Sequence, residues 1–259
     1  MHLIVINLAR ATERRARLGS ALEALGLQAE WLRAIDGASE LTDAQRSRAD
    51  QGARRAVSPY PLSDNEIACF LSHCRAMERL LESGLPMAVV LEDDAELLDG
   101  FVSTIEQIGA MTRSFDVIDL HRTFKRGEIF HPVDGPGTVP GLGRIGHTHV
   151  LATGYVISAA GARRFLAQTA RFAYPFDKEI HRYWRNGLDL YGIARPVVVQ
   201  NDAGHSFIDE DRHQNAVQLR PTYPHAWSAW WKLRRGWTRA VDRRLKHAAF
   251  ARWRDPAAS

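Results

Sequence analysis

The sequence predicts an α/β protein in which helices flank a mixed sheet, and three observations support this fold class. Short apolar segments rich in β-branched residues alternate with longer segments in which apolar residues recur at helical spacing. The segment 87–91 is apolar at every position, which is typical of a strand buried on both faces of a helix-covered sheet. A chain of 259 residues that is 45% hydrophobic also has enough apolar material for one large core.

The predicted elements alternate along most of the chain. In order, they are a strand at 2–8, a helix at 12–26, a strand at 29–35, a polar stretch to residue 57, a helix at 63–84, a strand at 87–91, a helix at 99–110, a strand at 116–120, a loop or hairpin region at 124–149, a strand at 150–157, a helix at 160–167, a helical stretch at 177–186 and a strand at 190–199. Thr12 and Ser158 are expected N-caps, and Ser63 with Glu66 predicts a capping box. Gly26 and Gly84 are expected to end their helices.

Positive charge and tryptophan are concentrated near the end of the chain. Residues 220–254 hold ten Lys or Arg against one acid, Asp242, which gives this segment a charge of +9. Because the formal net charge of the whole chain is +4, the remainder carries −5. The same segment holds five of the seven tryptophans. This change in composition predicts a globular domain at 1–220 and a basic, Trp-rich, helical tail at 221–259.

Composition and motifs exclude several classes of protein. No apolar run approaches the roughly 20 residues of a membrane-spanning helix, and residues 1–15 lack the order of a signal peptide, so a cytoplasmic location is expected. Cys69 and Cys74 lie outside bridging geometry in a predicted helix, and free thiols fit a reducing compartment. No glycine-rich phosphate loop or GxGxxG turn follows a predicted strand, which argues against a P-loop kinase and a dinucleotide oxidoreductase.

Three consecutive acids, Glu92, Asp93 and Asp94, directly follow the buried strand at 87–91. Their mutual repulsion is unfavourable unless a cation or hydrogen-bond donors offset it, and ligands of open α/β sheets bind at this end of the strands. Carboxylate oxygens suit Mn²⁺ or Mg²⁺, which often bridge carboxylates to the phosphates of a substrate. The triplet therefore predicts a metal-bridged diphosphate, and a solvated acidic turn is the alternative.

Four segments carry a resemblance to a known family. They are 4–8 with Arg10, Arg14 and Arg15; 34–37 (AIDG); 65–74 (NEIACFLSHC) continuing to 90–95 (VLEDDA); and 154–158 (GYVIS) with Gly161 and Ala162. Together they cover about residues 3–208 and resemble glycosyltransferase family 25, the bacterial lipopolysaccharide glycosyltransferases and their collagen galactosyltransferase relatives. Ala68 stands where this family usually has glycine. The resemblance implies a GT-A fold of Rossmann-like type, a UDP-galactose or UDP-glucose donor, a saccharide acceptor and transfer with inversion.

The resemblance also implies roles for residues near the first and third predicted strands. The acidic triplet is similar to the family's DxD motif, with Asp94 as a direct metal ligand, Glu92 near the ribose or the metal's waters, and Asp93 beside them. Ile6, Asn7 and Leu8, together with Asp36, are expected to hold the uridine. Arg10 and Arg14 are expected diphosphate contacts, and a solvated basic helix face is their alternative.

Inverting transfer needs a carboxylate that takes the proton of the acceptor hydroxyl. Asp177, in the sequence Tyr-Pro-Phe-Asp, matches a Pro-x-Asp element of the family and is the expected base; an N-cap, or a metal or sugar contact, are its alternatives. Asp116 and Asp202 are reserves. His205 is an expected metal or phosphate ligand, with plain solvent exposure as the alternative. Two further histidines, His147 and His149, are interpreted as loop or acceptor-site residues.

The basic tail allows three interpretations. An interfacial helix at an anionic membrane surface would use its tryptophans and arginines at the headgroups, which suits a lipid-linked acceptor. Alternatively, Trp227, Trp230 and Trp231 pack on the domain. Nucleic-acid binding ranks last because the rest of the chain is acidic. Two functions follow: a metal-dependent hexosyltransferase acting in the cytoplasm or on the inner face of the membrane, or a non-catalytic, membrane-associated module that has kept the fold.

Overall fold

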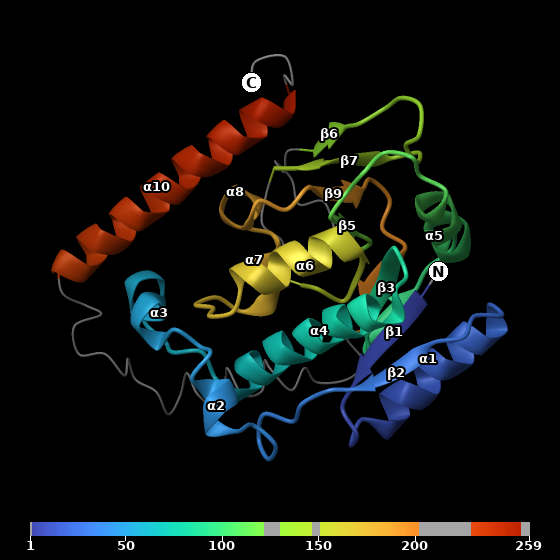
Figure 1. Cartoon of the computed structure of the whole chain (residues 1–259), viewed down its shortest axis with the longest axis horizontal. Coiled ribbons are helices and arrows are strands. Elements are labelled where there is room, and N and C mark those ends of the chain that lie inside the picture. The colour runs from blue at the N-terminus through green and yellow to red at the C-terminus, as the bar shows by residue number, and fades with distance from the viewer. Residues whose placement is uncertain (1, 122–129, 147–150, 202–228, 255–259) are drawn as a thin grey trace.

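The computed structural model describes residues 2–121, 130–146, 151–201 and 229–254, and an eight-stranded mixed sheet organises them (Figure 1). The strand order is β2-β1-β3-β8-β5-β9-β7-β6. The strands are β1 His2–Asn7, β2 Glu30–Arg33, β3 Met87–Glu92, β5 Val117–Asp119, β6 Phe130–Pro132, β7 Leu142–Ile145, β8 Gly154–Ser158 and β9 Leu190–Ile193. A second, two-stranded sheet pairs β4 Ala95–Leu97 with β10 Val198–Gln200.

Helices cover both faces of the large sheet, so the predicted α/β fold class is confirmed, while its GT-A type stays a prediction. The helices are α1 Thr12–Ala24, α2 Asp43–Arg46, α3 Gln51–Val57, α4 Asp64–Ser83, α5 Phe101–Gly109, α6 Ala159–Gln168, α7 Phe176–Ile180, α8 Tyr183–Asn186 and α10 Ala229–Arg254. Along β3, Ala88 and Val90 pack with residues of α4 and α6, whereas Val89 and Leu91 pack with residues of α1 and α5. This alternation explains why the strand is apolar at every position.

Several predicted helix ends are confirmed and one is wrong. At the start of α4, the Ser63 hydroxyl accepts a hydrogen bond from the Glu66 amide, and the Glu66 carboxylate accepts one from the Ser63 amide. At its end, Gly84 has a φ of 69°. Ser158 caps α6 through the Gly161 amide at 3.0 Å. Thr12, by contrast, is the first helical residue of α1 rather than its cap, since Ala11 holds the cap position and no side chain caps this helix.

The structure refines two other regions. The polar stretch before residue 57 contains two short helices, α2 and α3, which begin at side-chain caps Thr42 and Asp50. The segment predicted as one strand at 190–199 is divided between β9 and β10, which lie in different sheets. Pro196 lies between them and lacks the amide hydrogen that a continuous ladder needs. In the region 124–149, β6 and β7 form an antiparallel pair, as the hairpin alternative predicts.

The described part of the basic tail forms the long helix α10, which passes α3 and α8 (Figure 1). Trp231 Nε1 donates to the Arg55 carbonyl of α3 at 2.8 Å, and Ala249 is buried in the core. Leu233 and Trp237, four residues apart, are 72% and 71% exposed. Part of this helix therefore packs on the domain while one face points to solvent; Trp227 lies outside the described residues. Every described helix is too short or too polar to cross a membrane.

Candidate functional site

A pocket lies where β1, β2 and β3 end. These strands are parallel, and their register pairs Ile6 with Glu92 and Asn7 with Arg33, so the chain segments that follow them meet at one edge of the sheet. The pocket encloses about 1160 Å³, part of it open to solvent. Eight of the residues predicted for the site line it: Ile6, Leu8, Arg10, Arg14, Glu92, Asp93, Asp94 and Asp177.

Gly37 lines the same pocket and shows why this edge needs a residue without a side chain. A Cβ on Gly37 would lie 2.7 Å from Asn65 Cα and 2.7 Å from the Asp64 carbonyl carbon, both at the start of α4. The Asp-Gly turn after β2 therefore passes in close contact with this helix terminus. This contact places the start of α4 directly against the turn that follows β2.

Asp93 fastens the acidic triplet to β1. Its Oδ2 accepts from Asn7 Nδ2 at 2.8 Å and from the Leu8 amide at 3.3 Å, and its Oδ1 accepts from Arg14 at 3.1 Å. Asn7 also donates to the Ala11 carbonyl, so both amide hydrogens of Asn7 are used within the protein. Asn7 does not line the pocket, and its predicted contact with uridine stays a prediction.

Arg14 of α1 and Arg10, which lies just before that helix, each pair with a carboxylate. Arg14 is largely buried, with a side chain only 14% exposed, and lies 3.8 Å from Asp94 as well as bonding Asp93. Arg10 pairs with Asp36, which lies at the rim and does not line the pocket. Their expected contacts with a diphosphate remain predictions.

Asp94 has the features of a cation ligand. Its Oδ2 accepts from Gln200 Nε2 at 2.9 Å, whereas its Oδ1 is buried and has no hydrogen-bond partner among the described residues. Burial and the neighbouring Glu92 carboxylate raise the pKa of Asp94 to about 7. A buried carboxylate oxygen without a partner is unfavourable, and a divalent cation would satisfy it. The donor set therefore fits the predicted metal, with Asp94 as its ligand.

Gln200 was missed in the sequence because nothing near it suggests a link to the acidic triplet. It reaches Asp94 because β10 pairs with β4, whose first residue Ala95 lies opposite Gln200. The Asn201 amide also donates to the Asp94 carbonyl at 2.9 Å. The small second sheet thus positions the last carboxylate of the triplet.

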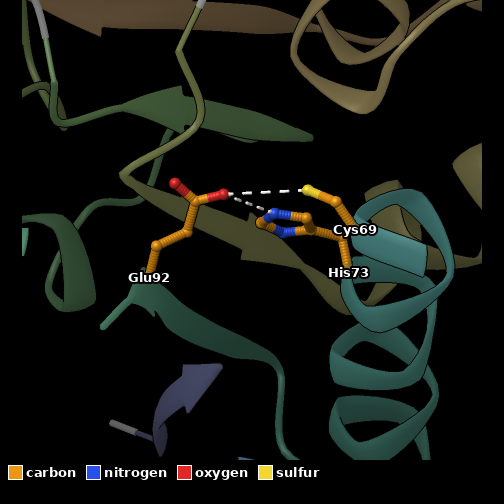
Figure 2. Close-up of side chains that lie close together, drawn as sticks. All are labelled: Cys69, His73 and Glu92. Atoms are coloured by element: carbon orange, nitrogen blue, oxygen red, sulfur yellow. Dashed lines mark hydrogen bonds and ion pairs between the residues drawn. The ribbon is translucent and has the colours of Figure 1, made fainter. Parts of the chain in front are cut away.

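Glu92 faces α4, where it meets His73 and Cys69 (Figure 2). His73 Nε2 lies 3.1 Å from Glu92 Oε1, and His73 Nδ1 lies 3.1 Å from the Tyr155 hydroxyl. Burial lowers the pKa of His73 to about 3, so the ring is neutral at pH 7. A neutral ring accepts from Tyr155 and donates to Glu92, which orients the carboxylate.

The same three side chains bring together three types of metal-binding group: a thiol, an imidazole and a carboxylate. Cys69 Sγ, His73 Nε2 and a Glu92 oxygen lie within 4.8 Å of one another. Burial raises the pKa of the Cys69 thiol well above its usual range, which opposes formation of the thiolate that binds metals. Burial and Asp93 raise the pKa of Glu92 to about 7. The i, i+4 spacing of Cys69 and His73 on α4 was the available sequence signal for this cluster.

Asp177 lines the same pocket from the first turn of α7, close enough for its charge to act on Glu92 at the end of β3. The helix begins at Phe176 with Pro175 in the cap position and no side-chain cap bond, so the N-cap alternative for Asp177 is wrong. The Phe176 ring stacks on His73 with centroids 3.8 Å apart. This stacking joins the segment that carries Asp177 to the helix that orients Glu92.

A buried histidine also supports Asp177. His181 Nδ1 lies 2.6 Å from the Asp177 carbonyl oxygen, and His181 Nε2 lies 3.2 Å from Asp119 at the end of β5. Because both partners are acceptors, both ring nitrogens donate and His181 is charged. Burial is the largest single influence and lowers the pKa of His181, but the hydrogen bond and charge of Asp119, together with the carbonyl and charge of Asp177, outweigh it and raise the pKa above 6.5.

Other predicted residues lie elsewhere. Asp116 precedes β5 at the opposite edge of the sheet, where it accepts from the Asp189 amide at 2.8 Å and pairs with Arg164. The remaining histidine and aspartate predictions, His147, His149, Asp202 and His205, lie outside the described residues. Their roles stay predictions.

The fold and site define an α/β protein whose ligand pocket, lined by acids, lies at the carboxyl edge of its sheet. The chain belongs to glycosyltransferase family 25: the family model described as "Glycosyltransferase family 25 (LPS biosynthesis protein)" matches residues 1–133. This result confirms the resemblance found in the sequence.

Named relatives differ in length and in reported activity. The chain is 33% identical to "Probable inactive glycosyltransferase 25 family member 3" of Rattus norvegicus, covering 76% of this chain and 37% of that protein. A mouse protein named "Inactive glycosyltransferase 25 family member 3" is 32% identical over 64% of this chain and 28% of its own length. This chain thus spans about a third of the mammalian relatives it matches.

A bacterial relative matches over most of both chains. "Lacto-N-neotetraose biosynthesis glycosyltransferase LgtB" of Neisseria gonorrhoeae is 30% identical, with 83% of each chain covered. Among solved structures, A197 from STIV is similar with a TM-score of 0.39 and 12% identity, covering 76% of this chain and 83% of that chain, a likeness too low to assign the fold type.

Proposed function

We propose that this protein is a metal-dependent, inverting glycosyltransferase that moves galactose or glucose from a UDP-sugar to a saccharide acceptor of lipopolysaccharide or a related glycan. Family membership and the match to LgtB along most of both chains support a transferase. The observation that carries the proposal is the pair of carboxylates in one pocket: Asp94, with a buried oxygen that has no partner among the described residues, and Asp177 of α7.

The residues of the pocket divide into a donor side and an acceptor side. On the donor side, the apolar Ile6 and Leu8 and the rim residue Asp36 suit a uridine, and Arg10 and Arg14 suit a diphosphate. Mn²⁺ or Mg²⁺ held by Asp94 would neutralise charge on the departing diphosphate. Arg14 lies 3.8 Å from Asp94, so the same arginine can meet the phosphates beside that carboxylate.

On the acceptor side, Asp177 is the proposed base. Its carboxylate takes the proton of the acceptor hydroxyl as that oxygen attacks the sugar, which is the role that inversion requires of a protein group. The charged His181 and the stacked Phe176 hold the backbone around Asp177, so the carboxylate is presented from a fixed turn. A fixed carboxylate lowers the entropy cost of reaching the reactive geometry.

The proposal includes contact with an anionic membrane surface on the cytoplasmic side. Leu233 and Trp237 are exposed on α10 among basic residues, an arrangement that suits lipid headgroups. Peripheral binding would bring the enzyme to a lipid-linked acceptor.

A non-catalytic nucleotide-sugar or glycan-binding module is the second candidate. The names of the mammalian relatives as inactive proteins favour it. The two candidates share the donor pocket and differ in turnover, so binding and transfer have to be measured on the same preparation.

A thermal-shift panel with UDP, GDP and their sugars, each with and without Mn²⁺, tests the proposal. A ligand at a hundredfold excess over its Kd should raise the melting temperature by roughly 5–10 °C for a domain of this size. We expect a UDP-sugar to stabilise the protein only with Mn²⁺. Asp94→Asn should abolish this shift, and Asp134→Asn, which changes an exposed carboxylate that does not line the pocket, should keep it. Absence of any nucleotide shift would refute the donor site, and a shift without transfer to any saccharide would favour the binding module.

A further inference from the structure

A second pocket, distinct from the one at the sheet edge, lies between α10 and the segment that contains α7 and α8. It encloses about 1150 Å³, part of it open to solvent. Four basic residues of α10 line it: Arg235, Arg239, Arg243 and Lys246. Their spacing of four, four and three residues places them on one face of the helix. Lys178 of α7 and Arg182 face them across the pocket. We call these residues the basic pocket.

The charges of the basic pocket are mostly uncompensated. Arg182 bonds Glu179 at 3.1 Å and lies 3.5 Å from Asp242, which Arg185 also bonds at 2.8 Å. Asp242 is the single acid among the described residues that line the pocket. Within the described chain, the other five basic side chains have no carboxylate partner: Lys178, Arg235, Arg239, Arg243 and Lys246.

Two of these cations are partly withdrawn from water. Arg235 Nε is buried without a hydrogen-bond partner among the described residues, and burial together with Arg239 lowers the pKa of Arg235. Burial also lowers the pKa of Lys246, whose ammonium lies 5.3 Å from the centre of the Trp184 ring. Concentrating like charges in a recess is unfavourable in the empty protein. An anion bound there would relieve the repulsion and supply the acceptor that Arg235 lacks.

The form of the pocket favours phosphate groups over a small carboxylate. Planar guanidinium groups match phosphate oxygens through paired hydrogen bonds, and three of the unpaired cations are arginines. The pocket is also far larger than a single anion, and Tyr174 and Trp184 contribute aromatic surface to it. A ligand that combines a phosphate with a sugar-sized body would fill it.

The basic pocket is linked to the sheet-edge pocket through α7. Asp177 lines the sheet-edge pocket and Lys178, the next residue, lines the basic pocket. An acceptor held by its phosphate in the basic pocket would lie beside the helix that carries the proposed base.

We propose that the basic pocket binds a phosphate group carried by the acceptor saccharide. The assignment to the acceptor rests on the proposed function, whereas the phosphate site itself can be measured without it.

Binding is measured by isothermal titration calorimetry on the full chain in metal-free buffer. The probes are inorganic pyrophosphate, glycerol phosphate as a soluble lipid headgroup, and a phosphorylated disaccharide with its unphosphorylated form. The test variant is Arg239→Gln/Arg243→Gln. The matched control is Lys232→Gln/Arg244→Gln, which removes two charges from exposed positions of the same helix that do not line the pocket. Asp94→Asn serves as the control for the sheet-edge pocket.

The phosphorylated disaccharide should bind at least tenfold more tightly than its unphosphorylated form and than glycerol phosphate. Its Kd should rise at least tenfold in Arg239→Gln/Arg243→Gln, change less than twofold in the control and stay unchanged in Asp94→Asn. Equal weakening in both charge variants, or no phosphate binding, would overturn the inference. Tightest binding of glycerol phosphate would assign the pocket to lipid headgroups and overturn the acceptor assignment, as would tightest binding of free pyrophosphate.

Failure of this inference is distinguishable from failure of the proposed function. If the protein binds UDP with Mn²⁺ but binds no phosphate probe, the inference about the basic pocket fails and the proposed donor site stands. If the protein binds neither ligand, both proposals fail. If it binds a phosphate probe but not UDP, the phosphate site stands and its assignment to an acceptor fails.

Discussion

The two pockets hold their charges in different ways. In the sheet-edge pocket, most polar groups have a partner within the protein: Asp93 accepts from β1 and Arg14, and His73 links Tyr155 to Glu92. In the basic pocket, five cations face one another without a carboxylate partner among the described residues. The first site is therefore ordered before any ligand arrives, while the second depends on its ligand for charge balance.

This difference follows from where each pocket is built. The sheet-edge pocket is formed at the ends of buried parallel strands, where the hydrogen-bond register fixes each neighbour. The basic pocket is formed by side chains of two packed helical segments near solvent. We therefore expect substitutions in and around the first pocket to affect stability or chemistry strongly, and those in the second to affect mainly ligand binding, with only small changes in stability.

The strongest test of the contrast is Asp177→Asn. Loss of a general base should lower kcat by about 10²- to 10⁴-fold, while the shift produced by UDP and Mn²⁺ stays as in the wild type. Single-turnover transfer and the thermal-shift panel measure the two effects. Equal loss of UDP binding and of transfer would remove Asp177 from the role of base.

A second test concerns the buried pair that supports Asp177. Asp119→Asn leaves His181 without its carboxylate and should lower the free energy of unfolding by about 3 kcal/mol, since the pair is fully buried. The raised pKa of His181 makes this contribution complete below pH 6.5, and it disappears as the pH rises through the value in the folded protein. Urea unfolding at pH 5.5 and 8.5 should therefore show the larger loss at pH 5.5.

The matched change in the basic pocket is Asp242→Asn. This acid pairs with Arg185, whose side chain is 41% exposed, so its loss should lower the free energy of unfolding by at most about 1 kcal/mol. A loss as large as that of Asp119→Asn, or one that depends on pH in the same way, would contradict the contrast between the two pockets.

The same substitution at two glycines should have opposite signs. Gly37→Ala would place a Cβ 2.7 Å from backbone atoms of α4 and should lower the free energy of unfolding by about 1–3 kcal/mol. Gly236, on α10, has nothing within 4 Å of such a Cβ, so Gly236→Ala should raise stability by about 0.5–1 kcal/mol. Chemical unfolding of both variants checks this; destabilisation by both would show that α10 is as constrained as the sheet edge.

The smallest effect on stability is expected at the outer face of α10. Leu233→Ser/Trp237→Ser should change the free energy of unfolding by less than about 0.5 kcal/mol, because both side chains are largely exposed. The double variant should nevertheless sediment less with vesicles that contain anionic lipid. Unchanged sedimentation would remove the proposed membrane contact of these side chains and leave both pockets unaffected.

Much of the fold and part of the site could be predicted because their signals are local in the sequence. The apolar run of β3, the capping box at Ser63 and the acidic triplet each lie within a few residues, and each was identified. The parallel strand ends explain why the triplet and the residues after β1 meet. The position of Gln200 beside Asp94 could not be predicted, because it depends on the pairing of β10 with β4.

The same reasoning explains the other omissions. His181 and Asp119 are 62 residues apart in the chain, and neither belongs to a recognisable motif. The break between β9 and β10 depends on which sheet each segment joins, although Pro196 was a local sign of it. The sequence showed only one part of the basic pocket, the excess of positive charge after residue 220. The pocket itself could not be predicted, because residues of the distant segment 174–184 also line it.

The location of the basic pocket on one long helix has an evolutionary consequence. Six of the eleven described residues that line it belong to α10, and most described side chains of this helix are not part of the core. Single substitutions along the helix can therefore change the size of the pocket and its charge in small steps, without altering the register of any strand. Selection can diversify ligand preference at this surface gradually, whereas the strand-end residues that also hold the sheet together are free to vary far less.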